Sequence, residues 1–149
     1  MYEGWQFERW DTLVSDIEFL TMISLTEIRG IIRIVVQGGF DLEQRQYCIE
    51  FEWSPAYRNI QEQYRLSLWK QIPEGVDGRK PGNTLIIPES KWIESFCGHE
   101  PIFELDVDKY RHYMICTGDD VIEVIANAPP KIYEVEPGKE EKNDEVSEL

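Results

Sequence analysis

Two short stretches of this chain combine side chains that could do acid–base or metal chemistry. The first holds His112 and, a few residues on, the pair Asp119-Asp120. An imidazole beside carboxylates can transfer protons, and paired carboxylates can bind Ca²⁺ or Mg²⁺. Asp is also favoured in tight turns by its local hydrogen bonds. We favour a turn role for both Asp and a core or rim position for His112, and keep the three as the alternative ligand or acid–base site.

The second stretch is Cys97-Gly98-His99, which offers a thiolate and an imidazole. Two ligands at that spacing do not make a metal site, because a structural zinc ion takes four. Asp106 and Asp108 form a further acidic pair. The chain contains no GxSxG, P-loop, GxGxxG, HExxH or EF-hand pattern. We therefore expect no metal and no cofactor, and the sequence leans against an enzyme while leaving catalysis open.

The charge of the chain restricts its partners. The net charge is −14, from 29 acidic and 15 basic residues. The last sixteen residues, from Glu134 on, hold 7 acidic residues and 2 Lys and contribute −5, so the rest of the chain carries −9. Nucleic acids and anionic membranes both require a basic surface, so we expect neither as a partner. A basic protein fits, as does a charge that serves solubility alone.

Length and composition predict one domain, residues 1–135, followed by an acidic tail of disordered composition, residues 136–149. No apolar run approaches the roughly 20 residues of a membrane span, and the N-terminus lacks the pattern of a signal peptide. The three cysteines (Cys48, Cys97 and Cys116) are odd in number and form no paired motif. A reducing cytoplasm is therefore the expected location. The oligomeric state is not indicated.

Alternation with a period of two predicts a meander of three strands near the N-terminus. These strands cover residues 17–26, 31–36 and 47–53, with Arg29-Gly30 at the first turn. In the third strand the aromatic face, Trp53 included, is expected to point into the core.

A later hairpin is predicted over residues 110–126, around a Gly-Asp turn. Apolar residues lie on both faces of both its runs, so we expect the hairpin deep inside its sheet. Residues 85–87 add a short strand, and residues 132–135 an extended segment.

Helical spacing of Tyr57, Ile60, Tyr64 and Leu68 predicts a helix over residues 57–70. A strand is the rival, because Tyr64, Leu66 and Leu68 also alternate. A second helix is expected over residues 92–97, and a helical turn near residues 7–14. The predicted fold is α+β: an antiparallel sheet of about six strands, made of the meander and the late hairpin, with two helices packed on one face.

A candidate partner-binding patch lies on the first of these helices. Arg58 and Glu62 are spaced i, i+4, which suits a surface ion pair. Tyr57 and Tyr64 lie beside them. Charges set among exposed aromatic rings could equally bind a protein, so these four residues form the candidate patch.

Residues 47–69 run from a strand through Ala56-Tyr57-Arg58 and Glu62 to Leu68-Trp69. Together with residues 112–126, this stretch resembles small uncharacterised bacterial proteins, some of which are similar to immunity proteins that neutralise secreted toxins. The resemblance implies a cytosolic, acidic, non-catalytic binder. Our leading hypothesis is a non-enzymatic protein-binding domain, immunity-like, against a basic toxin. The alternative is a small enzyme or ligand-binding protein that uses a pocket between sheet and helices.

Overall fold

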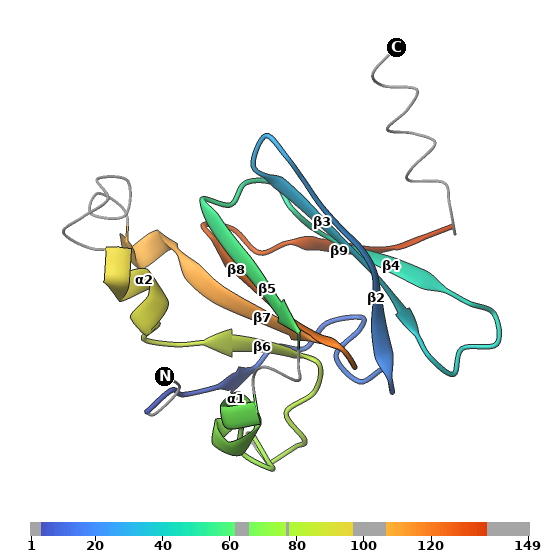
Figure 1. Cartoon of the computed structure of the whole chain (residues 1–149), viewed down its shortest axis with the longest axis horizontal. Helices are drawn as coiled ribbons and strands as arrows, with labels where there is room; N and C mark the ends of the chain where they lie inside the picture. The colour runs from blue at the N-terminus through green and yellow to red at the C-terminus, as the bar shows by residue number, and fades with distance from the viewer. Residues whose placement is uncertain (1–3, 62–65, 77, 97–106, 137–149) are drawn as a thin grey trace.

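The chain forms two antiparallel β-sheets that pack face to face (Figure 1). The computed structural model describes residues 4–61, 66–76, 78–96 and 107–136. The five-stranded sheet contains, in spatial order, β1 (Glu8–Arg9), β6 (Thr84–Ile87), β7 (Arg111–Cys116), β8 (Asp120–Ala126) and β5 (Ala56–Gln61). The four-stranded sheet contains β2 (Leu20–Ile28), β3 (Ile31–Gly38), β4 (Gln46–Phe51) and β9 (Lys131–Val135). Two short helices, α1 (Leu66–Gln71) and α2 (Lys91–Phe96), and a 3-10 turn (Val107–Lys109) complete the described elements.

The predicted α+β fold is wrong, because the structure is mostly β and divides its strands between two sheets. The sequence pattern shows which residues alternate, but not which strands pair. One core cluster joins both sheets, with Ile34 and Phe51 from one and Ile115 and Val124 from the other. A second sheet, rather than helices, therefore covers the inner face of the late hairpin.

The helices cover the outer face of the five-stranded sheet. Leu68 of α1 packs with Phe7 and Met114, and Ile93 of α2 packs with Tyr110 and Ile125, in two separate apolar clusters. Strands β7 and β8 are thus buried on both faces, as the predicted hairpin required, and both are interior strands. None of the helices in the described ranges is long and apolar enough to span a membrane.

The N-terminal meander is confirmed as β2, β3 and β4, with Ile34 opposite both Leu25 and Ile49. Its first strand begins at Leu20 rather than Ile17. Phe19 has φ of +53°, a left-handed conformation that a strand does not accept.

The burial predicted for Trp53 is wrong, since 37% of this residue is exposed. Strand β4 ends at Phe51, and the chain then turns away. The turn is held by Ser54, whose N–H donates to the Gly30 carbonyl at 2.9 Å and whose hydroxyl donates to the Ile125 carbonyl at 2.7 Å. Trp53 lies across Gly30 instead, where an added Cβ would come within 2.7 Å of the indole.

The helix predicted from Tyr57 is wrong over residues 57–61. These residues belong to β5, which pairs with β8, and the helix begins only at Leu66. The rival strand, argued from Tyr64, Leu66 and Leu68, is wrong at Leu66 and Leu68, which lie in α1. The strand at residues 57–61 precedes the residues on which that alternative rested. Pairing with β8 satisfies backbone groups that a helix would have satisfied locally, and no local pattern reveals that partner.

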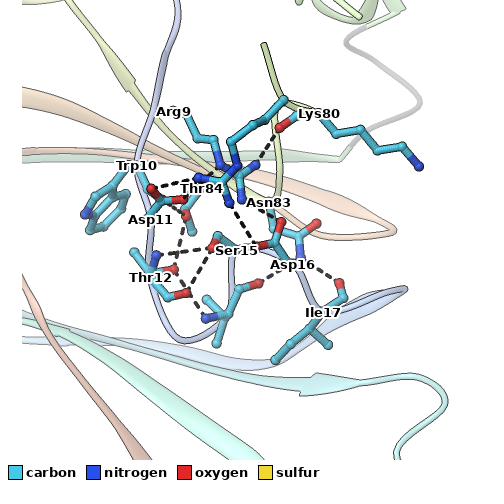
Figure 2. A network of polar contacts seen from close by, with 12 residues as sticks. Arg9, Trp10, Asp11, Thr12, Ser15, Asp16, Ile17, Lys80, Asn83 and Thr84 are labelled. Atoms are coloured by element: carbon cyan, nitrogen blue, oxygen red, sulfur yellow. Dashed lines mark hydrogen bonds and ion pairs between the residues drawn. The ribbon is translucent and has the colours of Figure 1, made fainter. Parts of the chain in front are cut away.

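The helical turn predicted near residues 7–14 is also wrong. After β1 the chain is held by side chains rather than by a helix, around the buried Arg9 guanidinium (Figure 2). Arg9 pairs with Asp11 at 2.8 Å and Asp16 at 2.6 Å, and donates to the Lys80 carbonyl. The Asn83 amide donates to the carbonyls of Val14 and Ile17, at 2.9 and 2.7 Å.

Candidate functional site

A chain of four hydrogen-bonded side chains crosses the outer face of the five-stranded sheet beneath α2. His112 on β7 and Glu123 on β8 are fully buried between the two apolar clusters of this face. Arg58 lies on β5, directly opposite Glu123. Ser90 follows β6 and precedes α2.

The distances along this chain are short and continuous. The Ser90 hydroxyl lies 2.7 Å from His112 Nδ1, and His112 Nε2 lies 2.7 Å from Glu123 Oε1. Arg58 donates from Nε to Glu123 Oε2 at 2.7 Å and from Nη2 to Oε1 at 3.0 Å. The carboxylate is therefore held from two sides.

Electrostatics fixes the direction of the hydrogen bonds to Glu123. Burial raises the pKa of Glu123, but hydrogen bonds from His112 and Arg58 outweigh it and lower the pKa from 4.5 to about 2. Glu123 is thus ionised at neutral pH and accepts a hydrogen bond from the Nε2–H of His112. In the neutral imidazole Nδ1 then carries the lone pair, and the Ser90 hydroxyl donates to it.

Aromatic rings enclose this imidazole. Trp5 and Trp92 approach His112 at centroid distances of 5.4 and 5.2 Å, both nearly edge-on. The Arg58 guanidinium lies over the Trp92 ring, 4.2 Å from its centroid, in a cation–π contact. Because these groups displace water, the polar chain lies in a low-dielectric setting, which strengthens each of its hydrogen bonds.

The turn between β6 and α2 places Ser90 over the imidazole. Glu89 has φ of +50°, a strained value for a residue that is not glycine, and it bends the chain sharply. Ser90 then caps α2, because its hydroxyl accepts the N–H of Ile93 at 3.1 Å and its carbonyl accepts that of Glu94 at 3.0 Å.

A cavity of about 310 Å³ adjoins this turn, and Ser90 and His112 both contribute to its wall. Of the Ser90, His112 and Glu123 residues, only Ser90 has any exposed area, 6%. Four further charged residues line the cavity: Glu8, Glu89, Asp108 and Arg111. The Ser90 and His112 end of the hydrogen-bonded chain thus adjoins a small, mainly acidic cavity.

The two Asp predicted beside His112 lie elsewhere. Asp119 is in the β7–β8 turn and Asp120 begins β8, where it exchanges hydrogen bonds with Thr117. From His112 to the end of β7 at Cys116 the strand rises about 13 Å, so this turn is remote from the imidazole. Glu123 is the carboxylate on His112. In the sequence Glu123 lies inside the apolar run of residues 121–126, which indicates a buried carboxylate. A buried charge requires partners, so this position could have pointed to the site.

The predicted partner-binding patch divides in the structure. Tyr57 is exposed, but Arg58 binds Glu123 and Trp92 rather than presenting its charge to a partner. Glu62 and Tyr64 lie outside the described residues.

The described ranges hold no group of three or more His, Cys, Asp or Glu placed to bind a metal ion. Cys97, His99 and Asp106 lie outside those ranges. Cys48 and Cys116 are buried in β4 and β7, as expected.

A second feature, which the sequence did not indicate, lies at one end of the four-stranded sheet. Three large apolar side chains are exposed there: Phe19 (66%), Phe40 (68%) and Leu42 (98%). We call these three residues the apolar end. The two phenylalanine rings meet edge to face at 4.6 Å.

The backbone holds the apolar end in place. Phe19 keeps its left-handed conformation while its carbonyl accepts the Gly39 N–H at 2.9 Å. A hollow of about 410 Å³ lies beside it, lined in part by Phe40, Leu42 and the acidic Glu18, Asp41 and Glu43. Arg45 also lines this hollow and pairs with Asp41 at 2.9 Å. Three carboxylates face this one cation, so the rim is acidic.

Comparisons with known proteins returned no relative. No protein-family model matches the chain, and no curated protein and no solved structure matches it.

Proposed function

We propose that this chain is a small acidic protein-binding domain whose apolar end, Phe19, Phe40 and Leu42, docks onto a basic partner protein. The observation that carries the proposal is the joint exposure of these three side chains on a fixed backbone. Exposed apolar patches with a polar rim are typical of protein interaction sites.

The backbone conformation of Phe19 supports a binding role for its exposed ring. A left-handed conformation at a bulky residue costs about 1–3 kcal/mol and persists where the surrounding structure imposes it. Here it keeps the ring outside, against Phe40, instead of letting it join the core. A partner that buries one such ring gains about 1.5–3 kcal/mol from the removal of apolar surface from water.

The negative charge of this chain indicates that the partner is basic. The rim residues Glu18, Asp41 and Glu43 outnumber Arg45, and the chain ahead of Glu134 carries −9. A basic surface would be attracted over a Debye length of about 10 Å at 0.1 M salt, which accelerates association. The resemblance to small bacterial proteins, some of which are similar to immunity proteins, supports a basic toxin as the partner and a bacterial cytoplasm as the place of action.

The test measures binding to the product of the gene adjacent to this one. Phe40→Ala combined with Leu42→Ser should weaken binding about tenfold or more, since buried aromatic anchors dominate interfaces. Tyr57→Ala is the matched control, because Tyr57 is also an exposed aromatic residue but lies on β5. Binding should also slow as salt rises. Equal effects of the two substitutions, or binding that is independent of salt, would contradict the proposal.

A further inference from the structure

We propose that Ser90 is a nucleophile toward small neutral or cationic carboxylic esters, with His112 as its general base and with Glu123 and Arg58 as positioning residues. This activity is independent of the apolar end. It rests on the continuous hydrogen-bonded order Ser90–His112–Glu123–Arg58 and on the cavity at the Ser90 end.

The hydrogen bonds of His112 orient it to accept the proton of Ser90. A serine hydroxyl is a weak nucleophile until an adjacent base accepts its proton. Glu123 accepts a hydrogen bond from the Nε2–H of His112, and in this tautomer the Nδ1 lone pair faces the Ser90 hydroxyl at 2.7 Å. Either imidazole nitrogen can serve as the base, provided that the opposite N–H is held by a carboxylate.

Ser90, His112 and Glu123 differ in their exposure to solvent. Trp5 and Trp92 flank the imidazole, and His112 and Glu123 have no exposed area, so the base is shielded from water. Ser90 and His112 both line the cavity, and Ser90 is the one of the three with exposed area, 6%. The Ile93 N–H already donates to its oxygen at 3.1 Å and would favour loss of the hydroxyl proton.

The cavity indicates the substrate class. Its volume of about 310 Å³ is at the lower end for ligand pockets, so the acyl group must be short. Glu8, Glu89 and Asp108 oppose the single Arg111, and this excess of carboxylates repels anionic esters. Apolar side chains, Ile86 and Ile93 among them, complete the wall.

In the first step the Ser90 oxygen bonds to the ester carbonyl carbon and its proton passes to His112 Nδ1. The bond from this carbon to the alcohol oxygen breaks, and the alcohol leaves with that proton. Water then attacks the acylated serine, giving up a proton through His112, and releases the carboxylic acid with Ser90 restored.

The test uses a fluorophosphonate probe on the full chain, followed by peptide mapping. Attack by Ser90 forms an oxygen–phosphorus bond and expels fluoride, and the proton passes to solvent. Label on Ser90 is expected. Ser54 and Ser95 are internal controls, since their hydroxyls donate to the backbone carbonyls of Ile125 and Trp92 rather than to an imidazole. No label on Ser90, or equal label on all three serines, would overturn the proposal and leave Ser90 as a helix cap.

Two variants separate reactivity from capping. Ser90→Asn keeps a side chain that caps helices well but removes the nucleophile, so labelling should disappear while α2 is retained. His112→Gln should slow labelling of Ser90 about a hundredfold or more, the usual contribution of a general base. Circular dichroism confirms that each variant is folded. Hydrolysis of p-nitrophenyl acetate should be lost in the same variants, and labelling of Ser90 at an unchanged rate in folded His112→Gln would remove His112 from the proposal.

The positioning role of Glu123 has its own readout. Glu123→Gln should slow Ser90 labelling about tenfold or more, because a neutral amide holds the Nε2 proton less firmly. The labelled residue should remain the same. An unchanged rate in folded protein would show that Glu123 serves the fold alone.

Discussion

Arg58 lies directly opposite Glu123 in the β5–β8 ladder and binds both oxygens of its carboxylate, at 2.7 and 3.0 Å. The carboxylate is fully buried, whereas the guanidinium is partly exposed and rests on Trp92. An ionised group in this position depends on its partners, because burial alone would favour the neutral acid. The pair therefore ties the edge strand β5 to the interior strand β8.

Removal of Arg58 should be strongly destabilising. Arg58→Leu leaves the Glu123 charge buried with His112 as its remaining identified partner, and the loss of one member of a buried pair costs about 3–5 kcal/mol. Denaturant unfolding measures the change in the free energy of unfolding. Arg45→Leu is the control, because the exposed Arg45–Asp41 pair should contribute much less. Equal effects of the two substitutions would show that the buried pair has no special weight.

Acid should destabilise the protein through Glu123. Its pKa falls from 4.5 in the unfolded chain to about 2 in the folded protein, so its contribution is complete above pH 4.5 and is lost as pH falls toward 2. A shift of this size corresponds to roughly 3 kcal/mol at most. Unfolding should be followed from pH 6 to pH 2 in the wild type and in Glu123→Gln. The variant should show a shallower dependence, and parallel curves would contradict the assignment.

Trp53 and Phe51 should differ sharply in their contributions to stability. Phe51 is fully buried in the core that joins the sheets, so Phe51→Ala should cost about 3–5 kcal/mol. Trp53 is 37% exposed and packs on Gly30 and Tyr110, so Trp53→Ala should cost about 1–2 kcal/mol. Denaturant midpoints of the two variants test this order. A larger loss for Trp53 would mean that the contact with Gly30 controls the turn after β4.

Chelation should leave the fold intact. The sequence predicts no structural metal, so EDTA should not change the melting temperature of the pure protein. Elemental analysis should find no stoichiometric zinc. A clear drop in melting temperature would direct attention to Cys97 and His99, outside the described part of the chain.

The sequence by itself determined the elements whose signals are local. Period-two alternation located the meander of β2, β3 and β4, and apolar residues on both faces placed the late hairpin in the interior of its sheet. Helical spacing after Pro88 located α2. Each of these patterns is complete within about ten residues, so no distant partner was needed to read it.

Tertiary structure decided how those elements were combined. Partners far along the chain determine three features that local patterns did not predict. These are the division into two sheets, the strand at residues 57–61 and the exposure of Trp53. His112 and Glu123 meet because the β7–β8 register pairs Met114 with Glu123, and a slip of one residue would turn Glu123 to the opposite face. Arg58 reaches Glu123 across 65 positions of sequence. The charge of the chain is a property of its composition, but the buried charge at its centre exists only because three strands align.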